Sequence, residues 1–184
     1  MIWNEVLCLG DSLTYGARDR YGRSYPAELG KLLSKETGEF YVCHNHGING
    51  ETSSDLLRRS WSAIKSNSSC RLMCLMIGTN DTKNPTPIHI YRDNVKQIIM
   101  SARAQGMTPI VGTLPALKFS PYYQNNREYI DIYNIELERM SSELGFILCD
   151  MSGLDNLLID GVHFDNEGYI EIAKRFAAAI LSLV

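Results

Sequence analysis

The sequence predicts one α/β domain over residues 1–184, in which a five-stranded parallel sheet lies between two layers of helices. Short apolar segments alternate five times with longer segments whose apolar residues recur at helical spacing. The apolar segments carry almost no charge, as expected for strands buried on both faces, and no repeat or linker-like stretch interrupts the pattern. This alternation is typical of a parallel sheet with helices on both sides. We therefore expect a three-layer, flavodoxin-like fold, for which 2-1-3-4-5 is a common strand order.

The first half of the chain is expected to supply three strands and two helices. The first strand is an uncharged run that stops at Gly10, and a polar loop follows it as far as Tyr25. Pro26 suits the first turn of a helix, and Gly38 suits the residue after its end. The elements of this half are expected over residues 6–9, 26–36, 40–44, 53–65 and 71–77.

The second half is expected to add two strands and three helices. Pro85 and Pro87 lead into a long helix with one apolar face. A loop with Phe119, Tyr122 and Tyr123 follows the fourth strand, so it is a candidate wall for a binding pocket; packing of these rings under a long loop explains them equally well. The elements of this half are expected over residues 88–105, 108–112, 126–144, 146–149 and 166–183.

The composition is that of an ordinary globular domain. Hydrophobic residues make up 45% and charged residues 21%, and the net charge of -3 leaves no basic stripe for nucleic acid. No apolar stretch is long enough to span a bilayer, so we expect no membrane partner. No basic region precedes an apolar run near the N-terminus, so we expect no signal peptide and a cytoplasmic location. An odd number of cysteines in that setting predicts reduced thiols packed in the core; they are Cys8, Cys43, Cys70, Cys74 and Cys149.

Polar residues follow three of the predicted strands at the point where each strand ends. They are Asp11 and Ser12 after the first strand, Asn49 and Gly50 after the second, and Gly78 and Asn80 after the third. The carboxyl ends of parallel strands lie at one edge of a sheet, so these loops are expected to face one another. Taken alone, Asp11 and Ser12 are better explained as residues that end a strand and cap the following turn.

Asp160 and His163, which precede the last predicted helix, supply what a serine nucleophile requires. Serine is a weak nucleophile until a base takes its proton, and that base needs an orienting partner. Asp160 and His163 are three residues apart around a glycine, so carboxylate and imidazole can pair while the second ring nitrogen stays available. The developing oxyanion needs donors, for which the backbone amides of Ser12 and Gly50 and the side-chain amide of Asn80 are suitable.

Four segments resemble, in order and spacing, the blocks of the SGNH (GDSL) hydrolase family. They are Gly10-Asp11-Ser12-Leu13, Asn45-x-Gly47-x-x-Gly50-x-Thr52, Gly78-Thr79-Asn80-Asp81 and Asp160-x-x-His163, and together they span almost the whole chain. The resemblance implies Ser12 as nucleophile, His163 as base and Asp160 as the residue that orients His163. It also implies an oxyanion hole formed by the Ser12 amide, Gly50 and Asn80. The family comprises serine esterases, lipases, thioesterases and carbohydrate deacetylases that need no metal and no cofactor.

The chain departs from the family pattern in one place and leaves a choice in another. Phe164 stands where many members have a proline after the histidine, which is expected to alter the local loop or a pocket wall. The glycine block offers both Gly47 and Gly50, and we choose Gly50 for the oxyanion hole because Glu51 and Thr52 follow it, as in family members.

We therefore expect an enzyme that hydrolyses carboxylic esters of small molecules. The chain has no long apolar lid, which favours short acyl groups such as acetyl. An acyltransferase with the same residues, or a non-catalytic α/β binding module, is the alternative. Arg18, Arg20 and Arg23 follow the serine, either to meet an anionic leaving group or, more simply, as a solvated charge run; Glu51 is also expected to be solvated. The sequence leaves the oligomeric state open.

Overall fold

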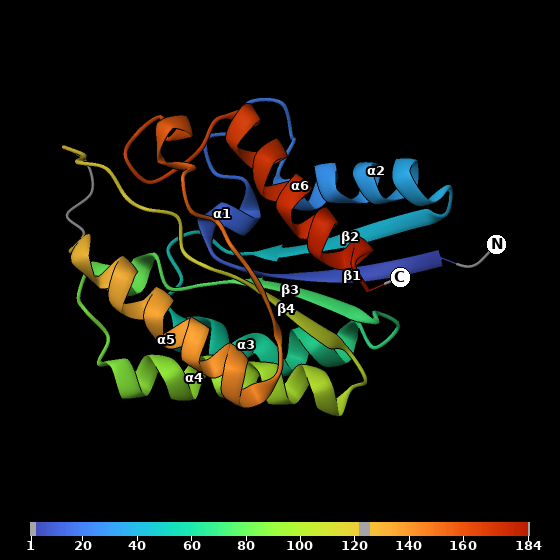
Figure 1. Cartoon of the computed structure of the whole chain (residues 1–184), viewed down its shortest axis with the longest axis horizontal. Helices are drawn as coiled ribbons and strands as arrows, with labels where there is room; N and C mark the ends of the chain where they lie inside the picture. Colours follow the sequence, from blue (N-terminus) through green and yellow to red (C-terminus); the bar gives the residue numbers. More distant parts are fainter. Residues whose placement is uncertain (1–2, 122–125, 184) are drawn as a thin grey trace.

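The computed structural model describes residues 3–121 and 126–183, and it has three layers built around one parallel sheet (Figure 1). The five strands pair in the order β2-β1-β3-β4-β5, all in parallel. The predicted fold class is therefore confirmed, and the strand order is the one common among flavodoxin-like folds. The strands are β1 (Trp3–Gly10), β2 (Phe40–Gly47), β3 (Leu72–Met76), β4 (Thr108–Gly112) and β5 (Ile147–Cys149).

Helices cover both faces of this sheet. In Figure 1, α3, α4 and α5 lie below the sheet, and α2 and α6 lie side by side above it. The helices are α1 (Ser12–Tyr15), α2 (Tyr25–Thr37), α3 (Ser53–Ser66), α4 (Ile88–Ala104), α5 (Glu128–Leu144) and α6 (Asn166–Leu181). Two single-turn 3-10 helices, η1 (Asn80–Thr82) and η2 (Asp155–Leu157), lie in the loops.

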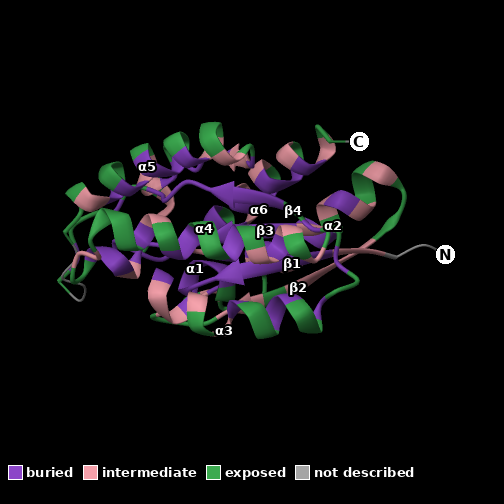
Figure 2. Ribbon diagram, turned by 90° about the horizontal axis from the view of Figure 1, so that it is seen from below, coloured by how far each residue is buried: buried purple, intermediate pink, exposed green. Residues whose placement is uncertain are grey.

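The sheet separates two apolar cores, and β1 contributes to both. Leu7 and Leu9 pack with α3, α4 and α5, whereas Val6 and Cys8 point to the opposite face and pack with α2 and α6. All four side chains are completely buried, which explains why the first strand is uninterruptedly apolar. Figure 2 shows the same division, with buried residues along the strands and on the inner faces of the helices.

Two differences from the sequence-based expectation lie at the carboxyl edge of the sheet. β2 continues to Gly47 instead of ending at residue 44, because its polar residues near that end still pair with β1 as far as Gly10. Helix α1 begins at Ser12, where a loop was expected, because the Asp11 side chain accepts the backbone N–H of Leu13 and caps this single turn. A four-residue helix is too short to produce a helical hydrophobic pattern.

The sheet register brings the ends of three strands to the same level. Gly10 lies beside Gly47 of β2 and beside Met76 of β3, so the loops after these strands start together. The approach is close enough to require glycine at position 47, because a Cβ atom there would lie 2.1 Å from the backbone nitrogen of Tyr15. The carboxyl edge of the sheet is thereby closed tightly around α1.

Candidate active site

Ser12 is fixed at the junction between β1 and α1. It is the first residue of α1, it is almost completely buried, and its backbone carbonyl accepts the N–H groups of Gly16 and Ala17. The hydrogen bond from the Leu13 N–H to the Asp11 side chain spans Ser12 and holds the start of α1. The Ser12 side chain is thus presented by a short, well-anchored segment at the carboxyl edge of the sheet, where ligands bind in open α/β folds.

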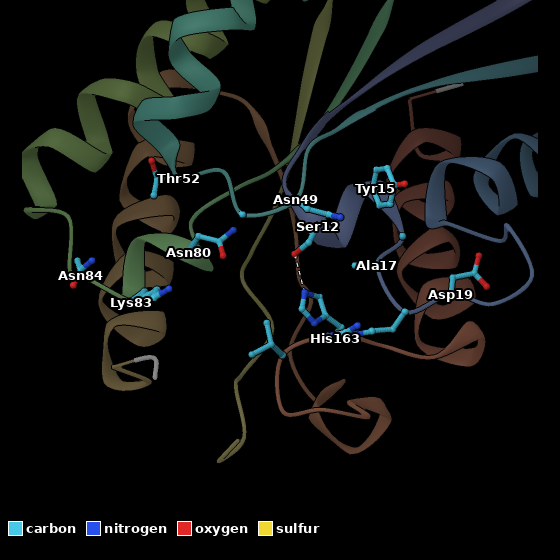
Figure 3. Close-up of a pocket in the computed structure, with 14 residues that line it drawn as sticks. Ser12, Tyr15, Ala17, Asp19, Asn49, Thr52, Asn80, Lys83, Asn84 and His163 are labelled. Carbon is cyan, nitrogen blue, oxygen red and sulfur yellow. Dashed lines mark hydrogen bonds between the residues drawn. The ribbon is translucent and has the colours of Figure 1, made fainter. Parts of the chain in front are cut away.

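Ser12, His163 and Asp160 form a continuous chain of hydrogen bonds, of which Figure 3 shows the contact between Ser12 and His163. The Oγ of Ser12 lies 3.0 Å from Nε2 of His163, and Nδ1 of His163 lies 2.9 Å from Oδ2 of Asp160. The contact between Ser12 and His163 joins residues 151 positions apart. With Nδ1 donating to the carboxylate, Nε2 carries no proton and can accept a hydrogen bond from the hydroxyl of Ser12.

The Asp160 carboxylate is held in its ionised form. Its Oδ1 accepts the backbone N–H groups of Val162 and His163, at 3.1 and 2.8 Å. Partial burial acts to raise the pKa of Asp160, but the hydrogen bonds from the backbone and ring of His163 outweigh it, and the pKa lies below its usual value. The carboxylate is therefore available to orient the ring over the ordinary pH range.

Phe164 anchors the segment that carries these two residues. Its ring is completely buried and meets the Tyr169 ring edge-on, with centroids 5.9 Å apart. Phe164 also forms a β-bridge with Leu158, across the loop from Asp160. Of the two expectations for this position, local loop geometry fits the structure; Phe164 does not line the cavity described below.

The three residues expected to bind an oxyanion lie beside one cavity. The cavity, of about 560 Å³, is lined by Ser12, Gly50, Asn80 and His163 among other residues. Asn80 Nδ2 donates to the carbonyl of Glu51 at 2.9 Å and, over a longer distance of 3.3 Å, to Oδ2 of Asp11. Gly50 has a positive φ of 81°, a conformation suited to glycine, whereas Gly47 lies at the end of β2 and does not line the cavity.

Two buried carboxyl groups, those of Asp11 and Asp81, form hydrogen bonds that hold the loops around the cavity. Asp11 is completely buried; burial, followed by the charges of Asp81 and Glu51, raises its pKa to about 7 in spite of the hydrogen bond from Leu13. Asp81 accepts both the backbone N–H and the hydroxyl of Ser53, at 2.8 and 2.6 Å, which ties η1 to the start of α3. Burial also raises the pKa of Asp81.

Glu51 is not solvated, which corrects the expectation from the sequence. It forms an ion pair with Arg59 of α3, with a shortest N–O distance of 2.6 Å, and its side chain is largely buried. Arg59 also donates to the main-chain carbonyl of His46 at 2.8 Å and, more weakly, to that of Gly10. This ion pair links α3 to the ends of β1 and β2. Glu51 and Arg59 are eight residues apart, so no short sequence motif predicts their pairing.

The cavity wall also contains residues that the sequence analysis did not single out. In Figure 3, Thr52, Lys83 and Asn84 lie on the Asn80 side of Ser12, and Tyr15 and Asp19 lie on the opposite side. Together with Asn49 and Arg18 they supply most of the polar side chains of the wall. All of these residues come from the loops and short helices that follow β1, β2 and β3. Their place directly after a strand is the feature of the sequence by which they could have been found.

Two expected cavity walls are not formed as anticipated. Phe119 is 79% exposed and does not line the cavity, and Tyr122 and Tyr123 lie outside the described residues. Of the three arginines after the serine, Arg18 lines the cavity and forms an ion pair with Asp160, whereas Arg20 and Arg23 are exposed and are not part of its wall.

Among the described residues, one group of side chains has the composition of a metal site. Glu5, His44 and Cys70 place one ligand atom each within 4.8 Å of one another, at the opposite end of β1 from Ser12. Nε2 of His44 and Oε2 of Glu5 already bond to each other at 2.7 Å, so the group is explained as an ion pair above a buried thiol. No helix in the described ranges has both the length and the apolar character needed to cross a bilayer.

The sequence profile of the GDSL-like lipase/acylhydrolase family matches residues 8–169, which include all of the residues discussed above for catalysis. The chain belongs to this family. It is accordingly an ester hydrolase, and the predicted family resemblance is confirmed. None of the curated protein sequences compared with the chain matches it.

Solved structures of several esterases and acylhydrolases share the fold over nearly the whole chain at low sequence identity. Est24, a carbohydrate acetylesterase from Sinorhizobium meliloti, is 18% identical with a TM-score of 0.83, covering 98% of this chain and 100% of its own. A lipase/acylhydrolase from Enterococcus faecalis is 17% identical with a TM-score of 0.85, covering 97% and 96%. The aryl esterase of M. smegmatis is 16% identical with a TM-score of 0.82, covering 98% and 100%. At these identities the likeness concerns the fold.

Proposed function

We propose that this GDSL-family hydrolase cleaves esters of short acyl groups, such as acetyl esters, through a covalent intermediate on Ser12. The supporting observation is the unbroken hydrogen-bond chain from Ser12 Oγ through His163 to Asp160, beside a cavity at the carboxyl edge of the sheet. Nucleophile, base and orienting carboxylate are each within hydrogen-bonding distance of the next, as acyl transfer requires.

The first half of the reaction forms the acyl-enzyme. Nε2 of His163 takes the hydroxyl proton of Ser12 as Oγ attacks the ester carbonyl carbon, and the carbonyl oxygen becomes an oxyanion. The backbone N–H groups of Ser12 and Gly50 and the Asn80 side chain are the proposed donors to that oxyanion. Collapse of the tetrahedral species breaks the bond to the leaving alcohol, which receives the proton from His163.

The second half releases the acyl group. His163 takes a proton from water, the resulting hydroxide adds to the acyl carbon, and the carboxylic acid leaves as Ser12 regains its proton. These steps use only side chains and backbone amides of this chain, so the proposal includes neither metal nor cofactor. An alcohol or a sugar hydroxyl in place of water would give an acyltransferase by the same chemistry.

The types of side chain that line the cavity support a small substrate with polar groups. Amide, hydroxyl and charged side chains from Asn49, Thr52, Lys83 and Asn84 outnumber large apolar groups in the wall. Pockets for long acyl chains are instead lined mainly by hydrophobic side chains. The carbohydrate acetylesterase activity named for the Sinorhizobium meliloti structure is consistent with this substrate class.

The test is hydrolysis of p-nitrophenyl acetate, butyrate, hexanoate and octanoate by the wild type and by Ser12→Ala. We expect kcat/KM to fall with chain length, and Ser12→Ala to lose on the order of 10⁴-fold or more. Ser62→Ala, which removes an exposed hydroxyl from α3, is the matched control and should keep full activity. Equal activity of Ser12→Ala and the wild type would reject the mechanism, and release of acylated alcohol on adding glycerol would identify the transferase alternative.

A further inference from the structure

Arg18 contacts the carboxylate that orients the proposed catalytic base. Its Nε lies 3.1 Å from Oδ2 of Asp160, the same oxygen that accepts Nδ1 of His163 at 2.9 Å. The two partners are 142 positions apart in the chain, on the loop after α1 and on the loop before α6. Asp160 is therefore shared between a permanent cation and the imidazole.

The backbone holds Arg18 in an unusual conformation at this position. Its φ of 72° makes it the one non-glycine residue with a positive φ in the described part of the chain. Such a conformation is unfavourable for residues with a Cβ atom, and glycine adopts it without strain. The neighbouring Ala17 is fixed on both sides, because its carbonyl accepts the hydroxyl of Tyr169 at 2.6 Å and its N–H donates to Ser12 at 3.0 Å.

Building on the proposed function, we infer that Arg18 is a positioning residue of this hydrolase that sets the pH range in which His163 acts as a base. The guanidinium holds Oδ2 of Asp160 in the orientation that receives the ring. Its positive charge also offsets part of the carboxylate charge, so protonation of His163 is less favourable than it would be beside an unshared carboxylate. The base therefore stays neutral, and able to accept the Ser12 proton, at lower pH.

Arg18 forms an ion pair with Asp160, whereas two other charged side chains of the described residues nearby have other partners. Asp19 accepts the backbone N–H groups of Tyr21 and Arg23, and Lys118 pairs with Asp155 on the outer side of the loop. The ionisable groups on the elements around the Asp160–His163 pair are Asp11 after β1, Arg18 and Asp19 after α1, Lys83 of the cavity wall and Tyr169 of α6. Lys118 after β4 meets this loop through its backbone N–H, which donates to Gly161.

The first test compares the pH dependence of kcat/KM for p-nitrophenyl acetate in the wild type, Arg18→Gln and Arg18→Lys. We expect Arg18→Gln to move the acidic limb of the pH profile to higher pH by about half a unit, because one partly screened positive charge is lost. At a given pH on that limb, kcat/KM should then fall about threefold. Arg18→Lys keeps the charge and should restore most of the shift. Arg20→Gln removes an equal charge from an exposed position in the same loop and should leave the limb unchanged.

Salt gives an internal check on the same assay. The Arg18 side chain is 56% exposed, so its field at Asp160 is open to screening by ions. Raising sodium chloride should bring the wild-type limb toward that of Arg18→Gln, while the variant moves less. An unshifted limb in Arg18→Gln, or an equal shift in Arg20→Gln, would overturn the inference.

Arg18→Gly separates this role from a structural one. Glycine suits the left-handed backbone, so the variant should unfold at the wild-type temperature or above it, yet show the same shift as Arg18→Gln. A lower Tm with an unshifted limb would mean that Arg18 only stabilises the loop.

A proton NMR titration makes the inference independent of turnover. The His163 ring signal, assigned by its loss in His163→Gln, should titrate at higher pH in Arg18→Gln than in the wild type. If the wild type released no p-nitrophenol from the ester, the proposed function would fail. This titration would still decide the role of Arg18. Equal midpoints would reject it.

Discussion

The Nδ2 group of Asn80 lies 3.3 Å from Oδ2 of Asp11, a carboxyl group that is completely buried and has a pKa of about 7. This contact couples an ionisable residue directly before the nucleophile to one of the proposed oxyanion donors. The same amide nitrogen donates to the carbonyl of Glu51 at 2.9 Å, which fixes the plane of the Asn80 side chain. The longer bond to Asp11 is the weaker of the two, so it is the one expected to yield to an oxyanion.

Asp11 is expected to make stability depend on pH between about 4 and 7. Its pKa is raised from 3.8 in the unfolded reference to about 7 in the fold, so over this range the folded chain binds the proton more tightly. Stability is then highest below the lower value and decreases as pH rises through the upper one, by a total of roughly 4 kcal/mol for a shift of this size. The prediction is measured by urea unfolding across that range.

Asp11→Asn isolates this contribution from the other titrating groups. Asparagine cannot ionise, so the difference in unfolding free energy between the variant and the wild type should change in favour of the variant as pH rises from 4 to 7. The slope of that difference should approach 1.4 kcal/mol per pH unit at its steepest. A difference that stays constant across the range would show that Asp11 does not titrate there.

Asn80→Ala is expected to lower kcat far more than it alters KM. An oxyanion donor acts when charge develops in the transition state, and its removal costs about 2.7–4 kcal/mol, or on the order of 10²–10³-fold in kcat. Asn80→Asp should be similarly inactive because it replaces the donor with an acceptor. Asn4→Ala, at the far end of β1, controls for a general effect of losing an asparagine. A kcat for Asn80→Ala within a few-fold of the wild type would exclude the oxyanion role.

Gly47→Ala is expected to disrupt the site by destabilising the fold. Its new Cβ would lie 2.1 Å from the Tyr15 nitrogen and 2.7 Å from the Asp11 carbonyl, which are backbone atoms that cannot move without displacing α1. Gly30→Ala, in the middle of α2, is the matched control, since the nearest atom would be 3.4 Å away and alanine favours a helix by about 0.5–1 kcal/mol. We expect a lower Tm and lower kcat in the first and an equal or higher Tm in the second; a wild-type Tm for Gly47→Ala would contradict the packing argument.

The sheet could be predicted because its central strands, β1, β3 and β4, are buried on both sides. Val6, Leu7, Cys8 and Leu9 leave no polar face, which excludes a half-exposed strand and implies helices above and below. Because the strands are parallel, the loops that follow them must meet at one edge of the sheet. The neighbourhood of Ser12 and Asn80 therefore follows from topology. The choice of Gly50 over Gly47 is a different matter, since it came from the resemblance to a family, and Gly50 stays a proposal.

The features that escaped prediction depend on contacts between distant residues. The ion pairs of Glu51 with Arg59 and of Arg18 with Asp160 join segments whose separation in the fold cannot be inferred from spacing. Charged residues in polar loops are usually solvated, and we expected the same of Glu51, which was wrong. For Arg18, the same reasoning missed the ion pair with Asp160. Phe164 was noticed only as a departure from a motif, and its burial against Tyr169 depends on how α6 packs.

Asp160→Asn and His163→Ala are expected to impair hydrolysis to different degrees. His163 is the only group proposed to move the Ser12 proton, so its loss should lower kcat by on the order of 10⁶-fold. Loss of the orienting carboxylate should lower kcat by on the order of 10⁴-fold. Single removals from the triad of a serine protease show this pattern. Asp160 accepts four hydrogen-bond donors, namely the backbone N–H groups of Val162 and His163, the His163 ring and Arg18. Asparagine therefore keeps part of its contacts with the backbone but loses the charge that favours the imidazolium. The measurement is kcat at a pH where the wild type is at its plateau, with circular dichroism to verify folding. If Asp160→Asn were as inactive as His163→Ala, Asp160 would have to take a direct part in proton transfer, and a role confined to orientation would be excluded.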